Sequence, residues 1–201
     1  MSIKKRIVCM KPNIHDLGYE PTDLHVTVSE LMVATADQSD DMLDRAITDV
    51  LKTLRDRLNM DVVFCSEFVD GQRVFRQVAT SGTRPTIAVG ESDELEQSWC
   101  QRVVDGRLPR FMADARADPV ASALLDQLPF PIGTHISTPI VLKNGEVYGT
   151  LCSFSFSPHD NPNPDDLKTL EMTAKLAALR LEGRNVMPAP RDVPDWDLKP
   201  K

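Results

Sequence analysis

Cysteine is the side chain in this sequence with the widest range of chemistry, and one of the four cysteines has an unusual setting. Cys100 directly follows a tryptophan in the segment ELEQSWCQRVVDGRLPRF, residues 94–111. A cysteine there can be a nucleophile, an anchor for a chromophore or a metal ligand, or it can simply pack in the core. Cys9, Cys65 and Cys152 are far apart and form no C-x-x-C pair, so we expect free thiols in a reducing compartment. The sequence leaves open which of these thiols, if any, is redox active.

Helical spacing indicates that Cys100 is packed rather than reactive. Residues 93–104 predict a helix, with Asp93 and Glu96 as a capping box. Its apolar stripe, at positions i, i+4 and i+8, consists of Leu95, Trp99 and Val103. Cys100 lies at the edge of this stripe and past the predicted first turn, and Arg102 points elsewhere on the helix. Because a reactive thiol needs a nearby cation or a helix N-terminus, we expect an unactivated thiol at the edge of a pocket.

His135 begins a predicted strand whose two faces differ in polarity. The more polar face carries His135, Ser137, Pro139 and Val141. That face would turn His135 toward a pocket, although a strand-edge histidine bonded to a loop carbonyl is the favoured interpretation. The histidine–cysteine spacing typical of zinc sites is absent, so no metal site is expected, and no pattern supports a haem ligand at His135.

Further candidate ligand contacts lie on two other segments. One face of the predicted strand in VYGTLCSFSF carries three of them: Tyr148, Thr150 and Cys152. Asp114 and Arg116, in the long Pro-punctuated excursion of residues 107–133, could bind a polar ligand, pair with each other or fix the loop. The motifs of P-loop, dinucleotide-binding, serine hydrolase and zinc protease sites are absent, which excludes those classes of enzyme.

The elements that must position these residues alternate between helices and hairpins. Apolar periodicity predicts amphipathic helices over residues 40–59 and 164–184. Two β-hairpins turn at Asp70-Gly71 and at Asn144-Gly145, of which the second is a type I′ turn signal. This order predicts an α+β fold, in which an antiparallel sheet has the terminal helices on one face and a pocket-forming helix and loop on the other.

Length and charge set the expected domain organisation and the class of partner. In a chain of 201 residues we expect one domain, residues 40–184, between a partly helical N-terminal extension, 1–39, and a Pro-rich flexible tail, 185–201. The net charge of −7 without a basic patch argues against nucleic acid as a partner. No apolar run reaches the roughly 18 residues of a membrane span and no signal peptide is recognised, so we expect a cytoplasmic protein without membrane contact.

Two phrases of the sequence resemble the GAF domain, a small-molecule sensory module of signalling proteins, and the resemblance covers residues 40–183. The first, STPIVLKNGEVYGTLCSFSF, has the small residue, proline, turn glycine and G-x-L strand that are typical of the family: Ser137, Pro139, Gly145, Gly149 and Leu151. The second, SWCQRVVDGRLPRFMADARADP, is similar to the helix, strand and loop that enclose the family's ligand pocket. The resemblance implies a GAF-like fold and a pocket with these candidate residues: Trp99, Cys100, Asp114, Arg116, His135, Ser137, Tyr148, Thr150 and Cys152.

The resemblance also implies a function: a non-enzymatic sensory or regulatory domain that binds an unidentified small molecule and signals through a homodimer or a partner protein. Some relatives hold a bilin on a cysteine, but a histidine usually follows that cysteine, whereas Gln101 follows Cys100. Two alternatives stay open, namely a redox enzyme like the free methionine sulfoxide reductases and a structural dimerisation module without a ligand. The sequence does not identify a cofactor.

The expected homodimer would form through the helices at 40–59 and 164–184, since GAF domains often dimerise through terminal helices. The second of these helices has two apolar stripes, of which one consists of Leu167, Leu170, Ala174, Ala177 and Leu181. The other consists of Met172, Leu176 and Leu179. One stripe can pack on the sheet while the other meets a partner, and a single wide buried face is an equal alternative.

Overall fold

A computed structural model of the chain describes residues 40–82, 87–159, 163 and 165–186, and these contain a six-stranded antiparallel sheet of order β3-β2-β1-β6-β5-β4. The strands are β1 (Val62–Val69), β2 (Gln72–Thr80), β3 (Ser92–Glu94), β4 (Phe111–Met112), β5 (His135–Val141) and β6 (Val147–Phe154). The α-helices are α2 (Asp40–Arg57), α3 (Trp99–Val104), α4 (Pro119–Leu125) and α5 (Asp165–Val186). The predicted extension at 1–39, which includes Cys9, and residues 187–201 of the predicted tail lie outside the described residues.

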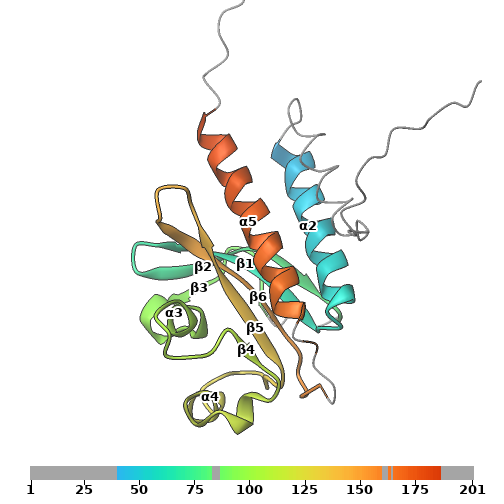
Figure 1. Cartoon of the computed structure of the whole chain (residues 1–201), viewed down its shortest axis with the longest axis vertical. Helices are drawn as coiled ribbons and strands as arrows, with labels where there is room; N and C mark the ends of the chain where they lie inside the picture. The colour runs from blue at the N-terminus through green and yellow to red at the C-terminus, as the bar shows by residue number, and fades with distance from the viewer. Residues whose placement is uncertain (1–39, 83–86, 160–162, 164, 187–201) are drawn as a thin grey trace, which may run out of the picture.

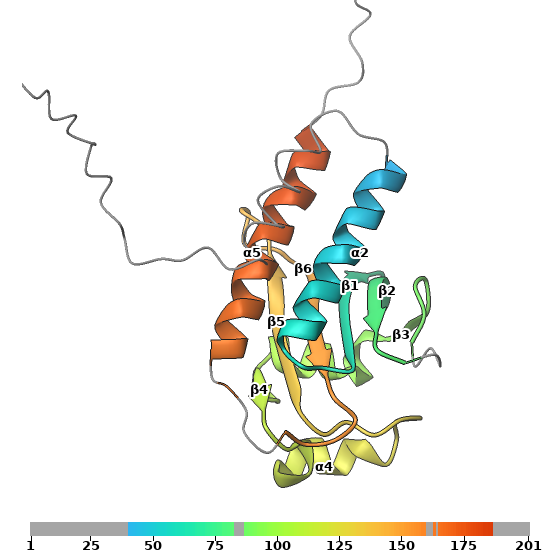
Figure 2. The same cartoon turned by 90° about the vertical axis from the view of Figure 1, so that its right-hand side faces the viewer.

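The helices divide between the two faces of the sheet. Both views show α2 and α5 side by side on one face, and Figure 1 shows α3 and α4 on the other (Figures 1 and 2). Leu54, Leu151 and Leu170 belong to an apolar core between the sheet and the α2–α5 layer. A second core, which includes Phe64 and Leu108, fills the α3 and α4 side. The α+β arrangement predicted from the order of the elements is therefore confirmed.

The two hairpins differ in the geometry of their turns. Asp70 and Gly71 both have positive φ, at 51° and 73°, so they form the tight two-residue turn that the dipeptide predicts. At the second hairpin only Gly145 has positive φ, and its N–H donates to the Leu142 carbonyl oxygen. The predicted type I′ turn is wrong there, because the five-residue loop from 142 to 146 lets the strands reverse without a left-handed asparagine.

Each hairpin also contains a β-bulge, and the bulges decide which side chains face α3. In β2, Gln77 pairs with Cys65 and Phe75 pairs with Ser66, so Arg76 is the extra residue between them. Arg73 and Phe75, between the turn and the bulge, face α3, and beyond the bulge Val78 also faces α3 whereas Ala79 faces the α2–α5 layer. In β6 the register skips Tyr148 in the same way, between the pairs that Val147 and Gly149 make with β5.

A close backbone approach at Gly149 brings β1 and β6 together beside the second bulge. A Cβ atom at this position would lie only 1.9 Å from the carbonyl oxygen of Ser66. Glycine therefore allows the two strands to pair at a point where any other residue would force the backbones apart. The pairing places Ser66 opposite Thr150, and their hydroxyl oxygens lie 2.9 Å apart inside the sheet.

The helix predicted over residues 93–104 begins later than its sequence pattern indicates. Asp93 lies in β3, which pairs with β2, so the predicted capping box is wrong. Ser98 caps α3 instead, and its hydroxyl oxygen accepts a hydrogen bond from the Gln101 N–H at 3.1 Å. Cys100 consequently lies in the first turn of α3 rather than beyond it. The buried face of this short helix is made of Trp99, Cys100 and Val103, and Cys100 is itself fully buried there.

Candidate functional site

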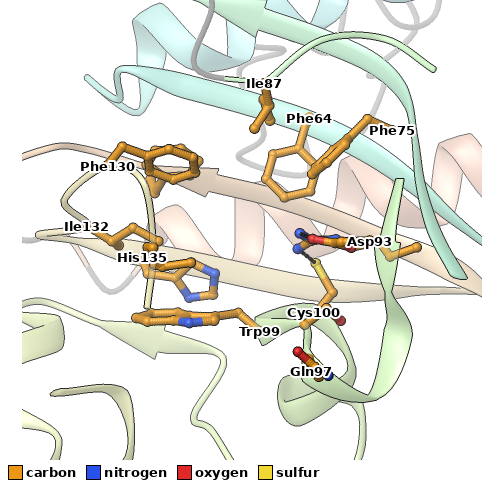
Figure 3. Close-up of a pocket in the computed structure, with 14 residues that line it drawn as sticks. Phe64, Phe75, Ile87, Asp93, Gln97, Trp99, Cys100, Phe130, Ile132 and His135 are labelled. Carbon is orange, nitrogen blue, oxygen red and sulfur yellow. Dashed lines mark hydrogen bonds and ion pairs between the residues drawn. The ribbon is translucent and has the colours of Figure 1, made fainter. Parts of the chain in front are cut away.

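A pocket of about 80 Å³ lies between the α3 side of the sheet and the segments that cover it. Figure 3 shows Trp99 and His135 toward one end and Cys100 with Asp93 toward the other. The remaining wall is largely aromatic and aliphatic, and its residues come from β1, β2, β6 and the loops: Phe64, Phe75, Ile87, Leu128, Phe130, Ile132 and Phe154. The pocket is thus an apolar enclosure with a few polar groups, which is the usual composition of a small-molecule site.

Arg73 is the charged group at the centre of the polar end. Its Nε donates to Asp93 Oδ1 at 2.9 Å, and a second guanidinium nitrogen pairs with the other carboxylate oxygen. Its Nη1 lies 3.2 Å from Cys100 Sγ. The guanidinium carbon also lies over the rings of Phe75 and Phe64, at 4.6 and 5.8 Å from their centroids. Only 12% of the Arg73 side chain is exposed, so the guanidinium has lost most of its hydration. The carboxylate, the sulfur and the two rings interact with it in place of that water.

Cys100 and Cys152 form a close pair beneath this cation. Their sulfurs lie 3.4 Å apart without a covalent bond, and both side chains are buried. The Ser137 hydroxyl lies 2.8 Å from Cys152 Sγ, and the Thr150 hydroxyl lies 3.2 Å from it. A hydrogen-bonded row therefore runs across the sheet from Asp93 to Ser137, with the two sulfurs in its middle.

The row separates the proton affinities of the two thiols. Burial by itself raises the pKa of Cys100, but the Cys152 hydrogen bond, the charge and hydrogen bond of Arg73, and the Thr150 hydroxyl outweigh it and lower that pKa to about 6. Burial and the neighbouring Cys100 raise the pKa of Cys152 well above its usual value. Of the two sulfurs, Cys100 is therefore the more acidic and the one that these neighbours favour as the thiolate.

Trp99 and His135 supply the polar groups at the other end. Their rings meet edge to face with centroids 5.3 Å apart. Trp99 Nε1 and His135 Nδ1 are buried, and within the described structure neither has a hydrogen-bond partner. Burial, together with the charge of Arg73, lowers the pKa of His135 to about 3, so its imidazole is neutral at physiological pH. The strand-edge histidine bonded to a loop carbonyl is not observed, because this ring faces the pocket.

The structure brings six of the nine predicted site residues to one place. Trp99, Cys100 and His135 line the pocket, whereas the other three contribute the row of polar groups behind Cys100: Ser137, Thr150 and Cys152. The alternation of β5 predicts the faces correctly, since Ile136 and Ile140 pack against the α2–α5 layer. That these residues bind a ligand stays a prediction.

Three predicted site residues lie away from the pocket. Asp114 and Arg116 belong to a short 3₁₀ turn on the surface, where the Asp114 carboxylate accepts from the Arg116 backbone N–H at 2.9 Å and fixes the loop. Tyr148 is the extra residue of the β6 bulge, so it packs against the core on the α2–α5 side instead of sharing a face with Thr150. The prediction for Tyr148 fails because strict alternation does not pass through a bulge.

Arg73 and Asp93 are the functional candidates that sequence reasoning missed. The hairpin turn at Asp70-Gly71 was the available signal, because a two-residue turn pairs Arg73 with Phe68 and so places it on the face of Phe64. The expectation that nothing activates Cys100 is corrected by this contact, since the cation comes from a strand 27 residues earlier in the chain.

Cys65 lies apart from the other two described cysteines. It packs against the core on the α2–α5 side of the sheet, opposite Leu151 of β6. Burial and the nearby charges of Glu67 and Cys100 raise the pKa of this thiol to about 12, so it stays protonated.

Across the described part of the chain no cluster of histidine, cysteine and acidic side chains could hold a metal ion. None of the described helices has the length and apolar composition to cross a membrane.

Comparisons with known proteins identify the family. The family model of the GAF domain matches residues 40–182, which is more than half of the chain, and the chain therefore belongs to the GAF domain family. Domains of this family commonly act as sensory, ligand-binding modules in signalling proteins. A search of curated proteins found no match.

Solved structures with this fold include proteins of different activity. The GAF domain of an Acinetobacter phosphoenolpyruvate-protein phosphotransferase is 14% identical, with 83% of this chain and 95% of that chain covered at a TM-score of 0.63. The phycocyanobilin-bound GAF domain of a cyanobacterial phytochrome is 14% identical, with coverages of 81% and 95% and a TM-score of 0.62. The type II free methionine-R-sulfoxide reductase of Thermoplasma acidophilum is 16% identical, with coverages of 71% and 94% and a TM-score of 0.55. At such identities these likenesses show the fold alone.

The lowered pKa of Cys100 gives a direct test by titration. As the pH falls through about 6 the thiolate takes up a proton, so its ultraviolet absorbance should disappear with a midpoint there. Cys100→Ser should remove this transition and Cys65→Ser should leave it unchanged. Arg73→Gln should raise the midpoint by at least about one pH unit, because it removes the stabilising cation. A wild-type protein with no thiol transition below neutral pH would contradict the assignment.

Proposed function

We propose that the domain is a cytoplasmic sensory module, which binds a small polar molecule in the pocket between the sheet and α3 and signals through a homodimer or a partner protein. One observation carries this proposal. Trp99 Nε1 and His135 Nδ1 are buried without hydrogen-bond partners within the described structure, and both side chains line the pocket. Leaving a buried donor or acceptor unpaired costs about 1–3 kcal/mol, so a molecule that pairs with them gains that difference on binding.

The pocket restricts the chemistry of this molecule. An indole N–H only donates, so the molecule needs an acceptor oxygen or nitrogen near Trp99. Arg73, Asp93 and the Cys100 thiolate together carry a charge of −1, which favours a neutral ligand over an anion. A water requires about 10–15 Å³ of such space, so the cavity of about 80 Å³ admits a ligand of a few non-hydrogen atoms rather than a bilin.

Native mass spectrometry of the protein purified from its own host tests ligand binding. The wild type should carry a non-covalent adduct that is lost on denaturation. Trp99→Phe keeps an aromatic ring but removes the N–H donor, so its adduct should fall at least about tenfold, the equivalent of one hydrogen bond. Tyr148→Phe, which removes a hydroxyl on the opposite side of the sheet, should retain the adduct. Bare protein in every preparation would contradict a bound ligand.

We also propose that α5, with α2 beside it, forms the homodimer contact. Leu170 and Ala174 of the first apolar stripe are buried against the sheet together with Ala178, so this stripe is used within the domain. Met172 and Leu179 lie on another side of the helix, one heptad apart, and are 42% and 45% exposed. Exposed apolar side chains at this spacing are the pattern of a helix that packs on a second helix.

The oligomeric state measured by light scattering tests this contact. The wild type should have the mass of a dimer, and the double variant Met172→Glu/Leu179→Glu should be monomeric, because two carboxylates would have to be buried at the contact. Val120→Glu, which changes an exposed apolar residue of α4 on the opposite face of the sheet, should leave the dimer intact. A monomeric wild type, or a double variant that stays dimeric, would contradict this surface.

A second candidate function, a redox enzyme of the sulfoxide reductase kind, is favoured by the 3.4 Å separation of the Cys100 and Cys152 sulfurs. Reduction of free methionine sulfoxide by the purified protein, with dithiothreitol as the electron donor, distinguishes the two functions. The sensory proposal expects no turnover above that of the Cys100→Ser/Cys152→Ser variant. Multiple turnovers that require both cysteines would replace the sensory proposal by the enzymatic one.

A further inference from the structure

The sulfurs of Cys100 and Cys152 lie close enough for a small movement to join them in a disulfide, and the proposed ligand binding does not use this closeness. We propose that Cys100 and Cys152 form a reversible disulfide when a small hydroperoxide enters the pocket, with Cys100 as the attacking sulfur and Cys152 as the resolving sulfur. The inference stands independently of the proposed ligand and dimer, because it depends only on the two sulfurs, their neighbours and the pocket that reaches them.

Distance and placement support the bond. The sulfurs lie 3.4 Å apart, and a disulfide needs about 2.05 Å, so they must approach by about 1.3 Å. Cys100 lies in α3, a helix of six residues, whereas Cys152 is in the centre of the sheet. The short helix can supply this movement together with rotation of the Cys100 side chain, without any change in the strand order.

The surroundings assign different roles to the two sulfurs. Cys100 lines the pocket and lies 3.2 Å from the guanidinium of Arg73, which stabilises the thiolate that attack requires. Cys152 lies behind it, fully buried, between Ser137 and Thr150, and is not part of the pocket wall. An oxidant in the pocket therefore meets Cys100 first. A small hydroperoxide has only a few non-hydrogen atoms, so its size is compatible with the cavity of about 80 Å³.

The chemistry takes place in two balanced steps. The Cys100 thiolate attacks the terminal oxygen of the hydroperoxide, the O–O bond breaks, and the leaving alkoxide or hydroxide takes a proton from solvent, so that Cys100 becomes a sulfenic acid. The Cys152 sulfur then attacks the Cys100 sulfur, the S–O bond breaks, and the hydroxyl group leaves as water with the Cys152 proton. Two electrons have moved from the sulfurs to the peroxide, and an added dithiol restores the two thiols by exchange.

Cys65 provides an internal control for this reaction. It is on the opposite side of the sheet, in the core next to the α2–α5 layer, and its raised pKa keeps it protonated. A protonated thiol is a poor nucleophile, so a hydroperoxide should leave Cys65 unmodified. Selective reaction at Cys100 and Cys152 would therefore separate the proposed site from general oxidation of cysteine.

The test is titration of the full-length reduced protein with hydrogen peroxide, followed by thiol blocking and non-reducing peptide mapping. One equivalent should link the peptides of Cys100 and Cys152, and dithiothreitol should reverse the link. Cys65→Ser should behave like the wild type. Blocked, unlinked Cys100 and Cys152 after peroxide treatment, or a link that involves Cys65 or Cys9 instead, would overturn the proposal.

Single variants test the roles of the two sulfurs. In Cys152→Ser the sulfenic acid should persist on Cys100 and be captured by dimedone, whereas in Cys100→Ser no sulfenic acid should form on Cys152. Capture at Cys152 in the second variant would overturn the assigned order. Both variants should keep the wild-type circular dichroism spectrum, because serine is close to cysteine in volume.

The contribution of Arg73 is measured by rate. Arg73→Gln should slow the oxidation of Cys100 at neutral pH by about tenfold or more, because the thiolate fraction falls when the cation is removed. Arg73→Lys keeps the positive charge and should recover most of the rate, which separates an electrostatic role from a loss of packing. An unchanged rate in folded Arg73→Gln would remove Arg73 from the mechanism.

Discussion

The buried guanidinium of Arg73 is the constraint on which the pocket side of the domain depends. A cation removed from water is tolerated only when neighbouring groups replace its hydration and balance its charge. Here β3 supplies the Asp93 carboxylate, α3 supplies the Cys100 sulfur, and two rings supply their faces. The strands β1 and β3 and the helix α3 are thereby held around the guanidinium of Arg73. The charge and the hydrogen bond of Arg73 also lower the pKa of the Cys100 thiol.

The two faces of the sheet differ in the kind of side chains that they bury. The side against α2 and α5 is packed with aliphatic side chains, whose burial stabilises the fold. The α3 side holds buried polar side chains next to aromatic residues. The hydroxyl groups of Ser66, Thr150 and Ser137 lie at hydrogen-bonding distance from their neighbours there. Because the first core stabilises the sheet, the second side can carry buried polar chemistry that a small single core would not support.

Sequence reasoning predicted the fold, and six of its nine candidate site residues lie together, for a physical reason. Alternation in a regular strand fixes which side each residue faces, so His135, Ser137 and Cys152 were placed on the correct side. The same reasoning failed at Tyr148, where a bulge interrupts the alternation. It also failed for the electrostatics of Cys100, since its cation arrives through hairpin pairing from another part of the chain. Periodicity describes one element at a time, whereas acidity depends on neighbours from several elements.

The bulges at Arg76 and Tyr148 have a consequence for how the length of this chain can vary. Each is one residue more than the ladder requires, and the pairs on both sides of it keep their faces. A relative that lacks either residue would have a regular ladder with the same side chains toward α3. The strand has no extra residue between Arg73 and Phe75, so a deletion there would shift the alternation by one residue. The guanidinium would then face away from the sulfurs. The two hairpins therefore can lose one residue at each of these two positions without a change of face elsewhere, which gives a structural rule for aligning divergent members of the family.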